Sequence, residues 1–159
     1  MHDAIRAYIA GFLDGDGSII FQLVRRCDYL YGFQIRASVC FYQSTRSRAG
    51  LEWLKQQLGC GYIRNRAGSM SDLTIVGWSA VRQVLELVQP FTIFKREQVD
   101  RALDILTRLD DKLTPREFVE VANEGRCIRN PKLLQTQAVG RAMRPGTAGE
   151  QGSPGPCND

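Results

Sequence analysis

The stretch that decides the fold is "IAGFLDGDG", residues 9–17. Its first half is apolar and favours a helix, and its second half carries two carboxylates, with three glycines in the whole stretch. Gly11 and Gly15 are four residues apart, so both lie on one side of a helix and let another backbone approach closely. Asp14 and Asp16 bring like charges together, which is unfavourable unless a hard cation such as Mg²⁺ accepts their oxygens. The plainer alternative, an Asp-Gly turn from a helix into a strand, accounts for one aspartate and one glycine only.

The stretch occurs once in the chain, so the simplest partner for its small-residue face is the same helix of a second copy across a two-fold axis. We therefore expect a homodimer, with the two copies of Asp16 near each other. The expected interface residues are Ala10, Gly11, Asp14 and Gly15.

Length and composition predict one globular domain. The 159 residues are 43% hydrophobic and 24% charged, and no apolar run approaches the roughly 20 residues that span a bilayer. The five cysteines are scattered, which argues against a disulfide scaffold and a structural zinc site. The N-terminus shows no secretory signal pattern. We expect an intracellular protein with no membrane partner.

The positive charge is concentrated in one segment. Residues 24–66 hold eight Lys or Arg against two acids, a net of +6, whereas the whole chain carries +4 and the remainder therefore −2. Such a segment favours a polyanionic partner, although a merely solvated basic face remains the alternative.

Hydrophobic periodicity and turn residues predict an α+β fold. The predicted helices are 3–14, 48–59, 79–90, 94–109 and 114–125, and the predicted strands are 18–26, 33–43, 60–66 and 72–78. The order αββαββα, followed by extra helices, allows the two hairpins to form one antiparallel sheet with helices on one face. We expect Gly59 to end a helix, Ser79 to cap one, and Thr114 to cap the helix that starts at Pro115.

We predict three parts along the chain. Residues 1–125 form the domain, 126–144 a C-terminal extension with some helical character, and 145–159 a Pro/Gly-rich flexible tail.

The open face of the predicted sheet carries Gln, Arg and Ser, the side chains that read base edges in the major groove of DNA. A water-facing sheet is the alternative, but Glu is absent from these strands. The candidate DNA contacts are Gln22, Val24, Arg26, Asp28, Tyr29, Gln34, Arg36, Ser38, Cys40, Arg64, Arg66 and Asp72.

"IAGFLDGDG" resembles the defining motif of the LAGLIDADG homing endonucleases, in register over all nine positions. The resemblance covers residues 5–125 and includes the αββαββα order and the segment "QPFTIFKREQ", residues 89–98. One motif in a chain of this length is similar to the homodimeric branch, typified by proteins of algal organelle introns. The resemblance implies a saddle-shaped antiparallel DNA-binding sheet.

The resemblance also implies roles for individual residues. Asp16 matches the essential metal-binding acid, and the carbonyl of Gly15 matches the backbone ligand beside it. Asp14 matches a position with a mainly structural role. Gln43 falls where the family places a water-ordering residue, and Lys95 where it places the active-site lysine.

A second basic residue of the active site is harder to place. Ser47 and Arg48 occupy its neighbourhood, and we take Arg48 as the candidate. Val24 and Cys40 stand where relatives often carry polar base-reading side chains.

The implied activity is a metal-dependent double-strand break, with Mg²⁺ or Mn²⁺ as cofactor, in a long pseudo-palindromic DNA site. It leaves short 3′ overhangs and promotes intron mobility, in a chloroplast or mitochondrion. Two alternatives use the same fold: an intron RNA maturase and a non-catalytic DNA-binding regulator. Both tolerate loss of Asp16 or Lys95, which this chain retains.

Overall fold

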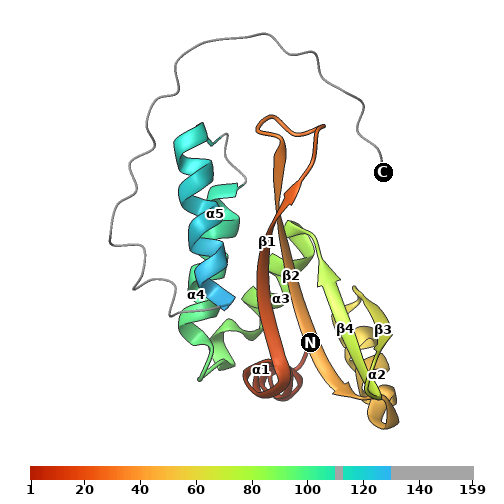
Figure 1. The fold of residues 1–159 in the computed structure, drawn as a ribbon. Helices are drawn as coiled ribbons and strands as arrows, with labels where there is room; N and C mark the ends of the chain where they lie inside the picture. The colour runs from red at the N-terminus through yellow and green to blue at the C-terminus, as the bar shows by residue number, and fades with distance from the viewer. Residues whose placement is uncertain (110–112, 130–159) are drawn as a thin grey trace, which may run out of the picture.

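The computed structural model describes residues 1–109 and 113–129 (Figure 1). Its elements follow the predicted αββαββα order with further helices at the end. They are α1 (Asp3–Asp16), β1 (Gly17–Arg25), β2 (Phe33–Ser44), α2 (Arg48–Leu58), β3 (Tyr62–Arg66), β4 (Met70–Val76), α3 (Trp78–Val88), α4 (Arg96–Leu109) and α5 (Pro115–Arg129). Short 3-10 turns precede α2 at Thr45–Ser47 and follow α3 at Gln89–Phe91.

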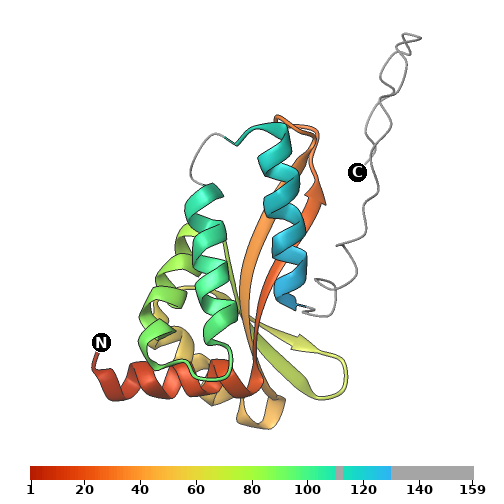
Figure 2. The same ribbon diagram turned by 90° about the vertical axis from the view of Figure 1, so that its left-hand side faces the viewer.

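The four strands form one antiparallel sheet in the order β1-β2-β4-β3. Alternation along the strands sends Ile35, Phe41 and Leu73 into the core, where each has at most 2% of its surface exposed. Figure 2 shows α3, α4 and α5 on that side of β1 and β2, while the β3–β4 hairpin extends away from them. The α+β fold with one covered and one open sheet face is as predicted.

The helix α1 forms one edge of the molecule and continues directly into β1. It runs to Asp16, two residues beyond the predicted end. A Cβ atom at Gly17 would lie 2.6 Å from Leu13 Cδ1. Only glycine therefore allows the first residue of β1 to pack this closely against the last turn of α1. The extension places Asp16 on the last turn of α1 rather than in a loop.

Two of the three predicted helix caps are confirmed. Gly59 has φ 68° and donates its N–H to Lys55 O at 2.9 Å, and Glu117 accepts from the N–H of Thr114 at 2.7 Å in a capping box. Ser79 is not a cap, because α3 begins at Trp78 after Gly77. The indole N–H of Trp78 donates to Ile35 O at 2.8 Å, which ties the first turn of α3 to β2.

α5 passes through the predicted domain boundary at residue 125 without a break. It lies so close to β1 that a Cβ atom on Gly125 would stand 2.8 Å from Phe21 Cβ. The helix therefore belongs to the packed domain up to its last described turn. The predicted extension beyond residue 129 and the predicted tail lie outside the described residues. Among the residues that are described, no helix is both long and apolar enough to cross a bilayer.

Candidate functional site

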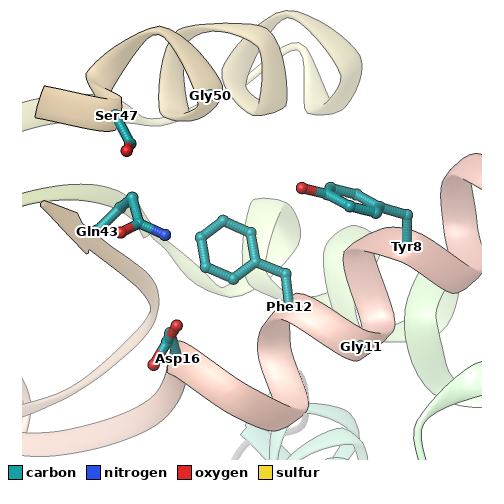
Figure 3. Close-up of a pocket in the computed structure, with 7 residues that line it drawn as sticks. All are labelled: Tyr8, Gly11, Phe12, Asp16, Gln43, Ser47 and Gly50. Atoms are coloured by element: carbon teal, nitrogen blue, oxygen red, sulfur yellow. The ribbon is translucent and has the colours of Figure 1, made fainter.

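Asp16 stands at the C-terminal end of α1 beside a hollow of about 420 Å³ (Figure 3). The hollow lies between α1, the end of β2 and the beginning of α2. Its lining residues are Tyr8, Gly11, Phe12, Asp16, Gln43, Ser47 and Gly50. The carboxylate of Asp16, the amide of Gln43 and the hydroxyl of Ser47 all face this space, so two predicted site residues are brought together.

The register of the sheet explains how Gln43 reaches Asp16. Gly17 pairs with Phe41, so Gln43 extends past the beginning of β1 and lies alongside the end of α1. Gln43 Oε1 accepts the N–H of Ser44 at 2.8 Å. This bond fixes the side chain, and its NH₂ group points into the hollow (Figure 3).

Lys95 approaches the same helix end from the segment before α4. Its Nζ donates to the main-chain oxygens of Leu13, at 2.8 Å, and Asp14, at 2.5 Å. A cation is favourable there because the last carbonyls of a helix carry partial negative charge. Burial lowers the pKa of Lys95 below its ordinary value, and the charges of Asp14 and Asp16 offset part of that effect. The three predicted residues Asp16, Gln43 and Lys95 therefore converge on one helix end.

The carboxylate of Asp14 is used inside the chain. It accepts the backbone N–H groups of Ile93 at 2.7 Å, Phe94 at 3.1 Å and Lys95 at 2.9 Å. Asp14 thus ties the segment that carries Lys95 to α1, which is a structural use of its carboxylate within one chain. No local pattern could indicate these bonds, because 79 or more residues separate the partners.

One residue of the predicted interface set does not reach the surface of the chain. Ala10 is fully buried within its own chain, since the 100° turn per residue of a helix points it inward beside Ile9 and Leu13. Gly11 and Gly15 are exposed, and a Cβ atom at either position would have nothing within 4 Å. The exposed small residues of α1 are Ala4, Ala7, Gly11 and Gly15.

The structure does not bring Arg48 to the hollow. Its Nε donates to Glu52 at 3.0 Å and its Nη1 to Asn65 at 2.7 Å, so the guanidinium connects α2 to β3. Ser47, the residue before it, lines the hollow instead. The side chains of Ser47 and Arg48 point in different directions because the 3-10 turn ends at Ser47 and α2 begins at Arg48.

On the open sheet face, Asp72 organises the basic side chains of β3. Its carboxyl has no exposed surface and accepts from Arg64 Nη2 at 3.1 Å, from Arg66 Nε at 2.5 Å and from the hydroxyl of Thr74. Burial alone would raise the pKa of Asp72, but these hydrogen bonds outweigh it and the pKa is lowered. Arg64 and Arg66 stay nearly half exposed, so Asp72 positions them instead of contacting a ligand itself.

The other predicted DNA contacts fall into three groups. At the β1–β2 loop, Arg26 binds both oxygens of Asp28, at 3.0 and 3.1 Å, and Gln34 Nε2 donates to the hydroxyl of Tyr29 at 2.7 Å. In mid-sheet, Ser38 and Cys40 keep 7% and 3% of their surfaces exposed, which leaves them little to offer a ligand. The remaining predicted contacts on β1 and β2 retain partial or full exposure: Gln22, Val24 and Arg36.

The donor set at the end of α1 suits a hard divalent cation. Within residues 1–109 and 113–129 no three His, Cys, Asp or Glu side chains group to hold a metal. Asp16 and the main-chain oxygen of Gly15 are oxygen donors, and Mg²⁺ in proteins commonly takes one or two carboxylates, with water and substrate phosphates completing its octahedron. The site therefore fits a metal that is shared with a phosphate ligand.

Comparison with known proteins adds to this geometry. The sequence profile described as LAGLIDADG endonuclease matches residues 9–100. The chain is 37% identical to DNA endonuclease I-CvuI of Chlorella vulgaris over 122 residues, which cover 76% of each protein. It is 36% identical to DNA endonuclease I-CreI of Chlamydomonas reinhardtii, over 72% of this chain and 70% of that one.

Solved structures show the same likeness. A crystal structure of I-CvuI in complex with the I-CreI target, in the presence of Mg and with the DNA not cleaved, superposes with a TM-score of 0.72. The aligned regions are 31% identical and cover 89% of this chain and 87% of the other. A second structure holds I-CvuI with its own target in the presence of Ca.

Proposed function

The chain belongs to the LAGLIDADG endonuclease family, and on this premise we propose that it is a site-specific homing endonuclease acting as a homodimer. The proposed reaction is a metal-dependent break of both strands in a long pseudo-palindromic DNA site. The observation that carries it is the convergence of Asp16, Gln43 and Lys95 on one end of α1, at the side of a sheet whose open face is basic.

The direction of α1 supports a particular dimer. α1 runs toward the sheet and ends at β1, and it lies together with α2 at the lower end of the molecule in Figures 1 and 2. A two-fold axis along α1 would bring Gly11 and Gly15 of two copies together and turn both open faces to the same side. One continuous duplex could then contact both faces, whereas an axis across α1 would turn them apart.

The open face supports binding of double-stranded DNA. Arg64 and Arg66 are held in place by a buried carboxylate, which lowers the entropy lost when they bind. Arginine pairs with guanine through two donors in the major groove. Because the arginines are repeated in each subunit, the preferred site is expected to be pseudo-palindromic.

The chain's own residues would divide the chemistry as follows. Asp16 and the carbonyl of Gly15 would hold Mg²⁺ or Mn²⁺, which stabilises negative charge on the scissile phosphate as a Lewis acid. The Gln43 amide would orient the attacking water by hydrogen bonding. Lys95 would place its positive charge beside the developing negative charge.

No histidine is available as a general base. The chain has one histidine, His2, and its Nδ1 accepts the N–H of Ala4 at the opposite end of α1 from Asp16. The proton of the attacking water is therefore expected to pass to solvent. Cleavage across the minor groove with short 3′ overhangs, intron mobility and a chloroplast or mitochondrial location complete the proposal, and they rest on the family resemblance and on the algal origin of the two relatives.

The test begins with a randomised DNA library, from which sites cleaved by the wild-type protein with Mg²⁺ are selected. On the selected site, EDTA and Asp16→Asn should each abolish cleavage, while gel-shift binding of Asp16→Asn in Ca²⁺ stays within a fewfold of wild type. Asp3→Asn is the matched control, because Asp3 lies on the same helix and its side chain is 73% exposed. Cleavage by Asp16→Asn at the control's rate, or binding of intron RNA without DNA cleavage, would refute the assignment.

A further inference from the structure

Two large apolar side chains lie exposed beside the candidate active site and take no part in the chemistry described above. Ile93 and Phe94 keep 76% and 87% of their surfaces exposed. Their backbone is nonetheless held firmly, because both N–H groups donate to the carboxylate of Asp14. A fixed, exposed pair of this kind is costly in water and typical of an anchor for another surface.

An apolar hollow lies on the other flank of α1. It has a volume of about 480 Å³ and is lined by Ala4, Ile5 and Tyr8 of α1 and by Gly50 and Trp53 of α2. Tyr8 and Trp53 form one wall, with ring centroids 5.6 Å apart in an edge-to-face arrangement. A dry apolar cavity of about 150 Å³ already accommodates a benzene molecule, so an aromatic ring fits here in size.

Gly50 marks where the hollow is open. A Cβ atom on Gly50 would have nothing within 4 Å, so no side chain of the same chain covers the hollow at this position. Gly50 also borders Gly11 and Phe12 in the hollow beside Asp16, which places it near the C-terminal half of α1. The segment that carries Phe94 is bound to that same half through Asp14.

We propose that Phe94 of each subunit inserts over Gly50 into the hollow of the partner subunit, an inference that rests on the proposed homodimer. In Figures 1 and 2, α1 lies between the segment leading into α4 and the helix α2. A two-fold axis along α1 sets the side of one copy that carries Phe94 against the side of the other copy that carries the apolar hollow. Anchor and hollow are therefore complementary parts of one self-complementary surface, as a two-fold interface requires.

The consequence for the reaction is geometric. Phe94 precedes Lys95 directly, and Gly50 lines the hollow that holds Asp16 and Gln43. The contact would therefore connect the lysine segment of one subunit to the active-site wall of the other. The two cleavage sites would be set in register by the same contact that stabilises the dimer.

The experiment measures the dimer dissociation constant by sedimentation over a concentration series. Phe94→Ala removes two contacts per dimer, each expected to weaken association about tenfold, so the constant should rise about a hundredfold. Leu30→Ala is the matched control: Leu30 is also 87% exposed, but it lies in the β1–β2 loop at the opposite end of the molecule from α1 (Figure 1), and its loss should leave the constant unchanged.

A double-mutant cycle locates the anchor. Gly50→Leu alone should weaken the dimer by filling the hollow, and adding Phe94→Ala should cost little more, because the ring no longer needs that space. A normal dimer for Phe94→Ala, equal weakening by Leu30→Ala, or additive effects of Gly50→Leu and Phe94→Ala would overturn the inference and leave the proposed endonuclease intact. A wild-type protein that stays monomeric on its own and on its DNA site would overturn both.

Discussion

Replacing Asp14 by alanine should destabilise the chain although Asp14 is only half-buried. The change removes the acceptor of three backbone N–H groups, those of Ile93, Phe94 and Lys95. A hydrogen bond to a charged group contributes about 1.5–3 kcal/mol. The amides of Ile93 and Phe94 are exposed and regain water, so the total loss is about 2–3 kcal/mol and comes mainly from the half-buried Lys95 amide.

Thermal unfolding followed by circular dichroism measures this loss. For a domain of this size about 2–3 kcal/mol corresponds to a fall in Tm of roughly 5–10 °C. Asp14→Asn keeps one acceptor oxygen and should lose about half as much. The control is Asp3→Ala, whose exposed ion pair with Arg6 contributes at most about 0.5 kcal/mol.

The same variants connect stability to the site. Because Asp14 holds the segment that carries Lys95, Asp14→Ala should also impair cleavage at temperatures where the protein is fully folded. An Asp14→Ala protein that melts together with Asp3→Ala would refute the account of these three hydrogen bonds.

Two further predictions concern the sheet. The folded-state pKa of Asp72 is below its ordinary 3.8, so its stabilisation is present above about pH 4 and is lost as the pH falls through the lower, folded value. Urea unfolding between pH 6 and pH 2.5 should therefore show a steep decline for the wild type and a shallower one for Asp72→Asn, and parallel curves would contradict the buried network. Gly125→Val should lower the free energy of unfolding by about 1–3 kcal/mol, because α5 would have to move away from Phe21; an unchanged urea midpoint would show that the helix shifts freely.

The sequence by itself determined the order of the elements and pointed to Asp16, Gln43 and Lys95, the candidate residues that the structure brings to one end of α1. Period-two alternation sets which strand residues share a face, since a shift of one residue would move all of them to the other face. Ile35, Phe41 and Leu73 are buried accordingly. The small residues and acid pair of residues 9–17 likewise fixed a helix that ends in a carboxylate. These features are local, so spacing along the chain is sufficient to reveal them.

Only the tertiary structure decided what each side chain contacts. Asp14 and Asp16 are alike in sequence, yet one binds amides 79 or more residues away while the other faces the hollow. Ala10 and Gly11 are neighbours, yet one is buried within the chain and the other exposed. The difference arises because successive side chains of a helix point 100° apart around its axis. Which element each side chain then contacts depends on parts of the chain that are distant in sequence.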